Sequence, residues 1–173
     1  MTGSLQELSD KQAITEVIYR YCRGLDRMDA DMVRAVWQPG GTADYGADMF
    51  RGTGDEFVEW VWAAHAGMER HSHQITNILI ELDGDTAASE SYVTVALRTR
   101  LDTRTKHDTG KAHQIEARGR YVDRWSRREG RWAIDHRHFV SDLTTTQETP
   151  PLDPTADESR RDRTDPSYEM LAQ

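Results

Sequence analysis

Three residues with acid–base or hydrogen-bonding side chains stand out in the sequence. Tyr21 and Asp26 lie on a predicted first helix, where Asp26 follows Cys22 by four residues and so ends a buried apolar stripe. His73 lies where the hydrophobic period changes from about 3.6 to about 2, at the start of a predicted sheet. A carboxylate paired with an imidazole forms a general base, because it fixes the tautomer and stabilises the imidazolium. Spacing alone leaves open a structural role for both residues, as a helix cap and a hydrogen-bonded histidine.

Three amphipathic helices are expected to come first in the chain and to position Tyr21 and Asp26. A capping box that starts at Ser9 begins the first helix, whose apolar stripe runs to Leu25. Asp29 is the predicted N-cap of a second helix, with Trp37 on its inner face. After a short hairpin, a third helix is expected over residues 55–70.

Long antiparallel strands are expected from residue 75 onward, because apolar and polar residues alternate there. The sequences around Gly84 and Gly130 predict hairpin turns, and Gly119 in mid-strand is expected to permit a bend. Strands of this length with one apolar face curl around whatever packs in their concavity, and the helices are the candidates.

The predicted fold class is therefore α+β, with a curved antiparallel sheet packed on the N-terminal helices. One domain is expected over residues 1–143. Residues 144–173 are rich in Thr, Pro, Asp and Arg and are predicted to form a polar tail without its own core. This tail is expected to be partly disordered or to dock as a lid or an oligomer arm.

The bulk composition argues against several classes of protein. The 173 residues suffice for one domain that can enclose a pocket, and the net charge of −8 argues against a nucleic-acid partner. No apolar run approaches the roughly 18 residues of a membrane span. The N-terminal residues lack the features of a secretory signal, and the lone Cys22 excludes an internal disulfide and a cysteine-based zinc site. We therefore expect a cytoplasmic protein without a membrane partner.

Three segments carry a resemblance to a known family: the run from Tyr21 to Asp26, the run from His73 to Asn77, and the closing strand at Gly130-Arg131-Trp132. Over residues 8–142 the chain resembles the SnoaL-like family, which has the cone-shaped nuclear transport factor 2 fold. Its motifs are most similar to the branch that contains hexachlorocyclohexane dehydrochlorinase, scytalone dehydratase and bile-acid 7α-dehydratase. Those enzymes eliminate HX or water with an acid–histidine pair and without a metal.

The resemblance implies catalytic roles for four residues of this chain. The catalytic Asp and His of the dehydrochlorinase fall on Asp26 and His73, and its active-site arginine falls on Arg137. The Tyr-x4-Asp motif of the bile-acid enzyme falls on Tyr21 and Asp26. Its second catalytic Asp falls near Val95, so that part of its site is missing. By strict alternation Arg137 faces away from the cavity, which it reaches only if a β-bulge shifts the register.

The predicted function is a lyase of dehydratase or dehydrohalogenase type, or an isomerase, with Asp26 and His73 as the general base. Tyr21 or Arg137 would stabilise the developing negative charge or the leaving group. No cofactor is expected, and no metal, since no carboxylate completes a ligand set with the histidines of the sheet. The expected substrate is small and apolar, possible classes being polycyclic or aromatic molecules. The predicted substrate-binding residues are Leu25, Trp37, Val61, Val93, Val95, His113 and Ile115.

Other interpretations stay open at this stage. The same fold serves non-catalytic ligand-binding proteins and the small β subunit of aromatic-ring dioxygenases, so the fold does not settle the function. Epoxide hydrolysis needs two acids that flank an arginine in the cavity, and the candidates Asp123 and Arg118 do not share a strand face. A homodimer or homotrimer is expected, because the outer face of the sheet is large and commonly makes the oligomer contact in the family.

Overall fold

The computed structural model describes residues 4–99, 112–150, 152 and 159–171. Its helices are α1 (Leu5–Asp26), α2 (Ala30–Arg34), α3 (Gly54–His65) and α4 (Pro166–Leu171). Its strands are β1 (Trp37–Asp44), β2 (Arg51–Thr53), β3 (Met68–Asp83), β4 (Thr86–Thr99), β5 (Ala112–Arg128) and β6 (Arg131–Thr149). No helix in these ranges is long and apolar enough to cross a membrane.

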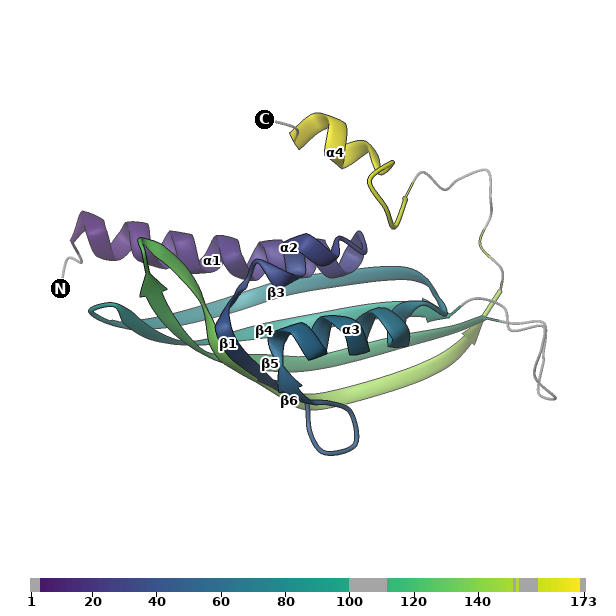
Figure 1. Ribbon diagram of the computed structural model, residues 1–173. Coiled ribbons are helices and arrows are strands. Elements are labelled where there is room, and N and C mark those ends of the chain that lie inside the picture. Colours follow the sequence, from purple (N-terminus) through teal and green to yellow (C-terminus); the bar gives the residue numbers. More distant parts are fainter. Residues whose placement is uncertain (1–3, 100–111, 151, 153–158, 172–173) are drawn as a thin grey trace.

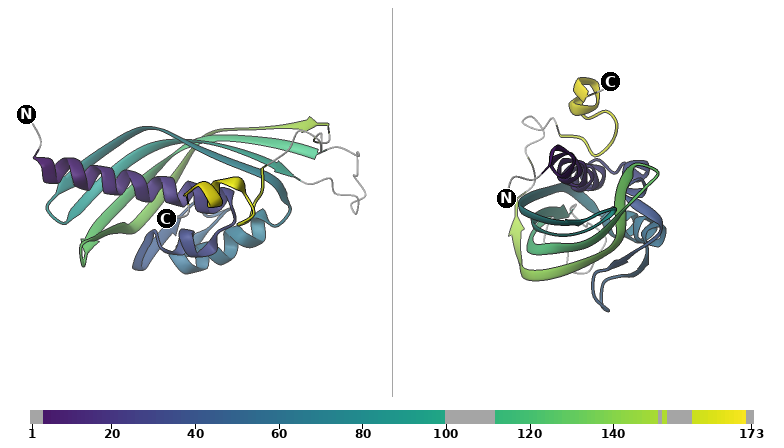
Figure 2. Two further views of the ribbon diagram at one scale, coloured as in Figure 1. Left: turned by 90° about the horizontal axis from the view of Figure 1, so that it is seen from above. Right: turned by 90° about the vertical axis from the view of Figure 1, so that its left-hand side faces the viewer.

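The strands form one curved sheet in the order β2-β1-β6-β5-β4-β3 within the described ranges. All neighbouring strands are antiparallel except β1 and β6, which run parallel. Helices α1 to α3 lie on the side toward which the long strands curl (Figures 1 and 2). The core lies between these two layers, and this arrangement confirms the predicted α+β class.

Helix α1 begins one turn earlier than the sequence pattern predicts. Ser4, not Ser9, is the N-cap: its hydroxyl accepts the N–H of Glu7 at 3.1 Å, and the Glu7 carboxylate accepts the N–H of Ser4. This reciprocal pair satisfies two N–H groups that a helix start leaves open. The predicted apolar stripe is confirmed, since Ile14 and Leu25 are fully buried against the sheet.

The second and third helices are shorter than predicted, because the residues expected at their C-terminal ends pair as strands with distant parts of the chain. Trp37 begins β1, where it pairs with Ile134 of β6 instead of extending α2. Helix α3 ends at His65, and β3 begins at Met68, which pairs with Thr99 of β4. Tertiary pairing of this kind overrides a local helical pattern. As a result, His73 lies inside a strand and not at its start.

A β-bulge in β6 turns Arg137 into the interior. Trp125 pairs with Ile134 but its neighbour Arg124 pairs with His136, so Asp135 is an extra residue on β6. The side chain of Arg137 is consequently fully buried. This register shift is the condition under which the sequence predicted that Arg137 reaches the interior.

Candidate active site

Asp26 and His73 are in direct contact in the folded chain. Oδ1 of Asp26 lies 2.6 Å from Nδ1 of His73, and the other oxygen, Oδ2, accepts the backbone N–H of His73 at 3.0 Å. The two side chains are 15% and 4% exposed, respectively. Because an ionised carboxylate can only accept, the ring proton belongs on Nδ1, and Nε2 keeps its lone pair. Asp26 and His73, whose contact the sequence left open, are therefore hydrogen-bonded in the arrangement that a general base requires.

Two elements position the pair. Asp26 is the last residue of α1, and His73 pairs with Val95 in the middle of the β3–β4 ladder. The carboxylate thus bonds to the strand backbone as well as to the ring, which limits its rotation about the helix end. Holding the base within hydrogen-bond reach of its partner is the geometric requirement for acid–base catalysis.

A hollow of about 270 Å³ opens beside the pair. Its lining residues are Tyr19, Cys22, Arg23, Asp26, Arg27, His73 and Ile75. Burial raises the pKa of the Cys22 thiol to about 12, so the thiol stays protonated and is a wall residue, not a nucleophile. Sequence reasoning missed Arg23 and Arg27, although their helical spacing from Tyr19 and Asp26 places them near the same face of α1.

Arg137 forms a buried ion pair with Asp123. Its Nε and Nη2 donate to the two carboxylate oxygens at 2.8 Å and 2.7 Å, and neither side chain has any exposed surface. The guanidinium lies 4.2 Å from the ring centre of Tyr21 and 4.1 Å from that of Tyr121. Burial opposes the charge on Arg137, but the Asp123 carboxylate outweighs it and holds the arginine pKa well above its usual value.

Sequence reasoning missed the role of Asp123, which it considered with Arg118 for epoxide hydrolysis and set aside because the two do not share a strand face. Asp123 alternates with Tyr121 and Trp125 on β5, and that alternation is the signal that places it inward. Arg118 instead points outward, where its guanidinium donates to Glu116 at 2.8 Å. The arginine that pairs with Asp123 is therefore Arg137 of the neighbouring strand β6, and not Arg118 of the same strand.

Tyr21 contributes a protonated hydroxyl next to this ion pair. Its oxygen lies 2.6 Å from the hydroxyl oxygen of Tyr45. Burial raises the pKa of both phenols well above the usual value of 10, so both keep their protons. Only one of the two protons can lie between the oxygens, which leaves the other available. Nη1 of Arg137 is also buried without a hydrogen-bond partner among the described residues.

The predicted substrate-binding residues do not gather around this hollow. Five of them are buried in the packed core: Leu25, Trp37, Val61, Val93 and Val95. His113 and Ile115 are half-buried on β5. Apolar alternation identifies the inward face correctly, but it does not separate residues that pack against each other from residues that line a space.

The two histidines of β6 lie close to polar side chains of β1. Nδ1 of His136 lies 2.8 Å from the Thr42 hydroxyl, and Nδ1 of His138 lies 3.7 Å from Asp44. Within the described ranges, no group of three or more His, Cys, Asp or Glu residues is placed to hold a metal ion.

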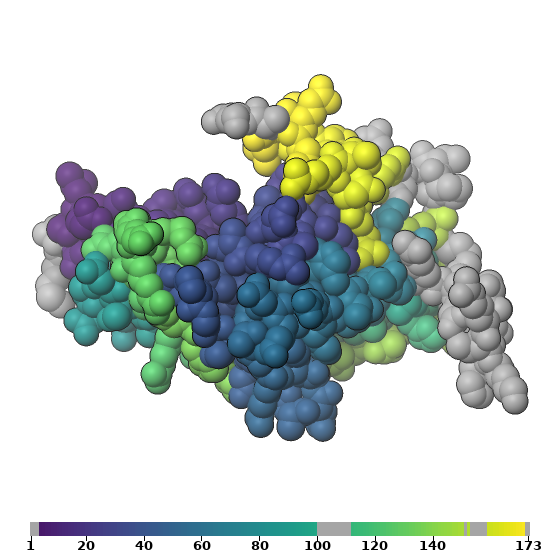
Figure 3. All heavy atoms as spheres, in the orientation of Figure 1, coloured from purple at the N-terminus to yellow at the C-terminus, as the bar shows by residue number. Residues whose placement is uncertain are grey.

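The C-terminal segment, residues 159–171, packs against the end of α1 that carries Asp26. Arg23 donates to Ser167 at 3.0 Å and lies 4.7 Å from the ring centre of Tyr168, and Arg27 pairs with Asp165 at 3.2 Å. Figure 3 shows this segment, in yellow, lying against the helical layer. Because Arg23 and Arg27 also line the hollow beside the Asp26–His73 pair, the segment holds part of its wall in place.

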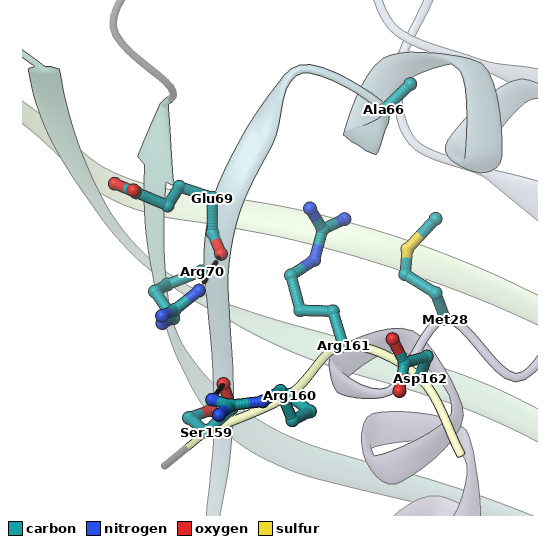
Figure 4. A pocket seen from close by; sticks show the side chains of 8 residues that line it. All are labelled: Met28, Ala66, Glu69, Arg70, Ser159, Arg160, Arg161 and Asp162. Carbon is teal, nitrogen blue, oxygen red and sulfur yellow. Dashed lines mark hydrogen bonds between the residues drawn. The ribbon is translucent and has the colours of Figure 1, made fainter. Parts of the chain in front are cut away.

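A second hollow, of about 540 Å³, lies between this segment and the start of β3 (Figure 4). Its lining residues are Met28, Ala66, Glu69, Arg70, Ser159, Arg160, Arg161 and Asp162. Arg161 extends toward the loop that joins α3 to β3, where it donates to the carbonyl of His65 at 2.9 Å and to that of Met68. The hollow is thus rich in charged groups, unlike the core.

Helix α1 packs with one face on the curved sheet and carries the acid of the acid–histidine pair. The chain belongs to the SnoaL-like domain family, which matches residues 6–138. No curated protein matches the chain.

Solved structures share its fold along most of their length. Hexachlorocyclohexane dehydrochlorinase LinA-type3 from Novosphingobium barchaimii LL02 has a TM-score of 0.70 at 17% identity, covering 88% of this chain and 100% of that chain. A scytalone dehydratase-like protein from Novosphingobium aromaticivorans DSM 12444 has a TM-score of 0.69 at 19% identity, covering 88% and 97%. An aromatic ring hydroxylase-like protein from Novosphingobium aromaticivorans has a TM-score of 0.67 at 23% identity, covering 82% and 94%. At these identities the likeness shows the nuclear transport factor 2-like fold alone.

Two histidines near the site, the buried His71 and the half-buried His65, predict how stability depends on pH. Burial lowers the pKa of His65 from 6.5 to about 3 and that of His71 from 6.5 to about 4. Below pH 6.5 the unfolded chain binds protons that the folded chain does not. The free energy of unfolding should therefore fall as the pH drops from about 6.5 to about 4.

Urea unfolding at several pH values tests this expectation. A His65→Asn/His71→Asn double variant should lose less stability than the parent over the same range, since the carboxylates that also titrate are common to both. Equal slopes in the two proteins would contradict the assignment of the effect to these histidines.

Proposed function

We propose that the protein is a cofactor-independent lyase of dehydratase or dehydrohalogenase type, or an isomerase, that acts on a small and mainly apolar molecule. The observation that carries the proposal is the 2.6 Å contact between Asp26 and Nδ1 of His73, with both side chains largely buried. An acid–imidazole pair shielded from water is strongly coupled, because electrostatic interactions grow as the local dielectric falls.

In the proposed reaction, Nε2 of His73 removes a proton from a carbon next to an activating or leaving group. The electron pair of the broken C–H bond forms a C=C bond. In an elimination, hydroxide or halide departs with the electron pair of its bond to carbon. In an isomerisation, nothing departs: the double bond shifts and the imidazolium returns the proton to a different carbon. Asp26 stabilises the imidazolium that results, and such a base contributes roughly 10²–10⁴-fold to the rate.

Negative charge that develops on the substrate needs donors that are already in place. The protonated phenol of Tyr21 and the unpartnered Nη1 of Arg137 are candidates for this role. Cys22, the residue after Tyr21 on α1, lines the hollow beside Asp26 and His73. The proposal therefore assigns proton abstraction to the Asp26–His73 pair and charge stabilisation to Tyr21 and Arg137.

A turnover screen tests the proposal. We would incubate the protein with cyclic β-hydroxyketones and polychlorinated cyclohexanes and follow loss of water or HX by mass spectrometry. The expected result is turnover that falls roughly 10²–10⁴-fold in His73→Ala and is unchanged in Leu79→Ala, whose side chain is exposed on β3. Turnover that persists in His73→Ala would contradict the assigned base.

A second candidate is a non-catalytic role, as a ligand-binding protein or as the small subunit of an aromatic-ring dioxygenase. The likeness to a ring hydroxylase-like structure is the observation that favours it. Co-purification of a large subunit, together with no turnover in the screen, would support this candidate over the lyase. A scaffold subunit has no use for a buried acid–base pair, which is why we rank it second.

A further inference from the structure

A second histidine joins the same two elements as the Asp26–His73 pair. His71 precedes His73 by two residues on β3, and its Nδ1 lies 3.1 Å from the carbonyl oxygen of Leu25 in the last turn of α1. A carbonyl oxygen can only accept, so Nδ1 of His71 carries the proton and donates it. Leu25 is the residue directly before Asp26. Three hydrogen bonds, at 3.1, 3.0 and 2.6 Å, therefore join Leu25 and Asp26 to His71 and His73.

The end of α1 is held by backbone hydrogen bonds from the turn that follows it and by hydrogen bonds with β3. Helix ends fray, because their last carbonyl groups lack partners within the helix. Asp26 is the final helical residue, and the chain turns sharply two residues later at Met28, whose φ is +51°. The Leu25 carbonyl accepts backbone N–H groups of this turn, with that of Met28 at 3.2 Å, and it also accepts the Nδ1–H of His71 from β3.

We propose that His71 is a positioning residue, which fixes the end of α1 so that the Asp26 carboxylate stays within hydrogen-bond reach of His73. The inference rests on the proposed function, in which that pair is the general base. His71 would act through Asp26 and not on the substrate.

The surroundings of His71 favour a fixed orientation of its ring. The ring of His65, at the end of α3, lies 4.3 Å from it between centroids, and the carbonyl of His65 accepts a hydrogen bond from Arg161. The titratable or charged groups that face His71 are His65 of α3, His73 of β3, Asp26 of α1 and Arg161 of the C-terminal segment. Burial lowers the pKa of His71 to about 4, so the ring is neutral at neutral pH and one proton serves the bond to Leu25.

Nε2 of His71 is buried and has no hydrogen-bond partner among the described residues. The bond from Nδ1 to the Leu25 carbonyl is therefore the polar contact that sets the ring. A side chain that keeps a donor at the position of Nδ1 should keep the function of His71, and one that places its donor elsewhere should lose it.

Three substitutions separate these cases. His71→Asn places an amide nitrogen near the position of Nδ1, His71→Gln places it near that of Nε2, and His71→Leu removes the donor while filling a similar volume. The first readout is the ring NMR signal of the Nδ1–H of His73 at neutral pH, which needs no substrate. The second is the turnover of a substrate found in the screen described above.

The Nδ1–H signal of His73 should persist in His71→Asn and should be lost or exchange faster with water in His71→Leu and His71→Gln. Turnover should stay close to the parent's in His71→Asn and fall roughly 10–10²-fold in the other two, because a misplacement of about 1 Å costs up to about 10²-fold. If His71→Leu does not fold, the comparison of His71→Asn with His71→Gln tests the inference.

An unchanged His73 signal in folded His71→Leu or His71→Gln would overturn the inference, as would loss of the signal in His71→Asn. A merely structural role would lower the stability of all three variants and leave the signal alone. The two proposals can fail separately. If the His73 signal persists in His71→Asn and is lost in the other two variants, but the parent turns over no substrate, the positioning role stands and the proposed function fails.

Discussion

Asp123→Asn is expected to lower the free energy of unfolding by about 3–5 kcal/mol, because it leaves Arg137 as an uncompensated buried charge. Both side chains are fully buried, and the carboxylate accepts two hydrogen bonds from the guanidinium. The rings of Tyr21 and Tyr121 also lie against the guanidinium, at 4.2 Å and 4.1 Å from ring centre to Cζ. Urea or guanidinium unfolding of the two proteins measures the difference.

The matched control is Asp142→Asn, which removes the carboxylate that pairs with Arg120 on the outer face of the sheet at 3.4 Å. That pair is partly exposed, so its loss should change stability by no more than about 1 kcal/mol. Replacing both buried partners, as in Asp123→Leu/Arg137→Met, should recover much of the stability. Similar small losses in Asp123→Asn and in the control would contradict the buried ion pair.

Asp26→Ala is expected to lower the rate of the proposed elimination by roughly 10²–10⁴-fold, because His73 loses the group that fixes its tautomer and stabilises its charge. Residues that act as a unit give non-additive losses. The double variant Asp26→Ala/His73→Ala should therefore be little worse than His73→Ala alone. The measurement is kcat/KM for the parent, both single variants and the double variant.

Glu16→Gln is the control for this comparison, because Glu16 lies on the exposed face of the same helix. It should leave kcat/KM unchanged. Losses that multiply in the Asp26→Ala/His73→Ala variant would mean that the two residues act independently, which is incompatible with a single general base.

The sequence predicted the features that depend on local patterns. The stripe that ends at Leu25 placed Asp26 at the end of a buried helix face, and alternation identified the inward face of the sheet. The lengths of the helices depend on pairing with distant strands, such as Met68 with Thr99, and no local signal reveals it. The homodimer or homotrimer stays a prediction.

In the candidate site, too, the contacts that depend on distant strands or on backbone groups could not be predicted from the sequence. The burial of Arg137 depends on one extra residue, Asp135, which becomes apparent only when β6 is aligned with β5. Asp123 could have been found by alternation, but its partner lies on another strand. The bond from His71 to the Leu25 carbonyl had no signal at all in the sequence, because one of its two partners is a backbone group.

The tautomer of His73 is the most direct test of the Asp26–His73 pair. Nitrogen-15 NMR of the ring at neutral pH should show the proton on Nδ1 and the lone pair on Nε2 in the parent, because the carboxylate accepts from Nδ1 at 2.6 Å. In Asp26→Ala the proton should redistribute toward Nε2. A parent ring with its proton on Nε2, or a tautomer that Asp26→Ala leaves unchanged, would contradict the pair and the base it is proposed to form.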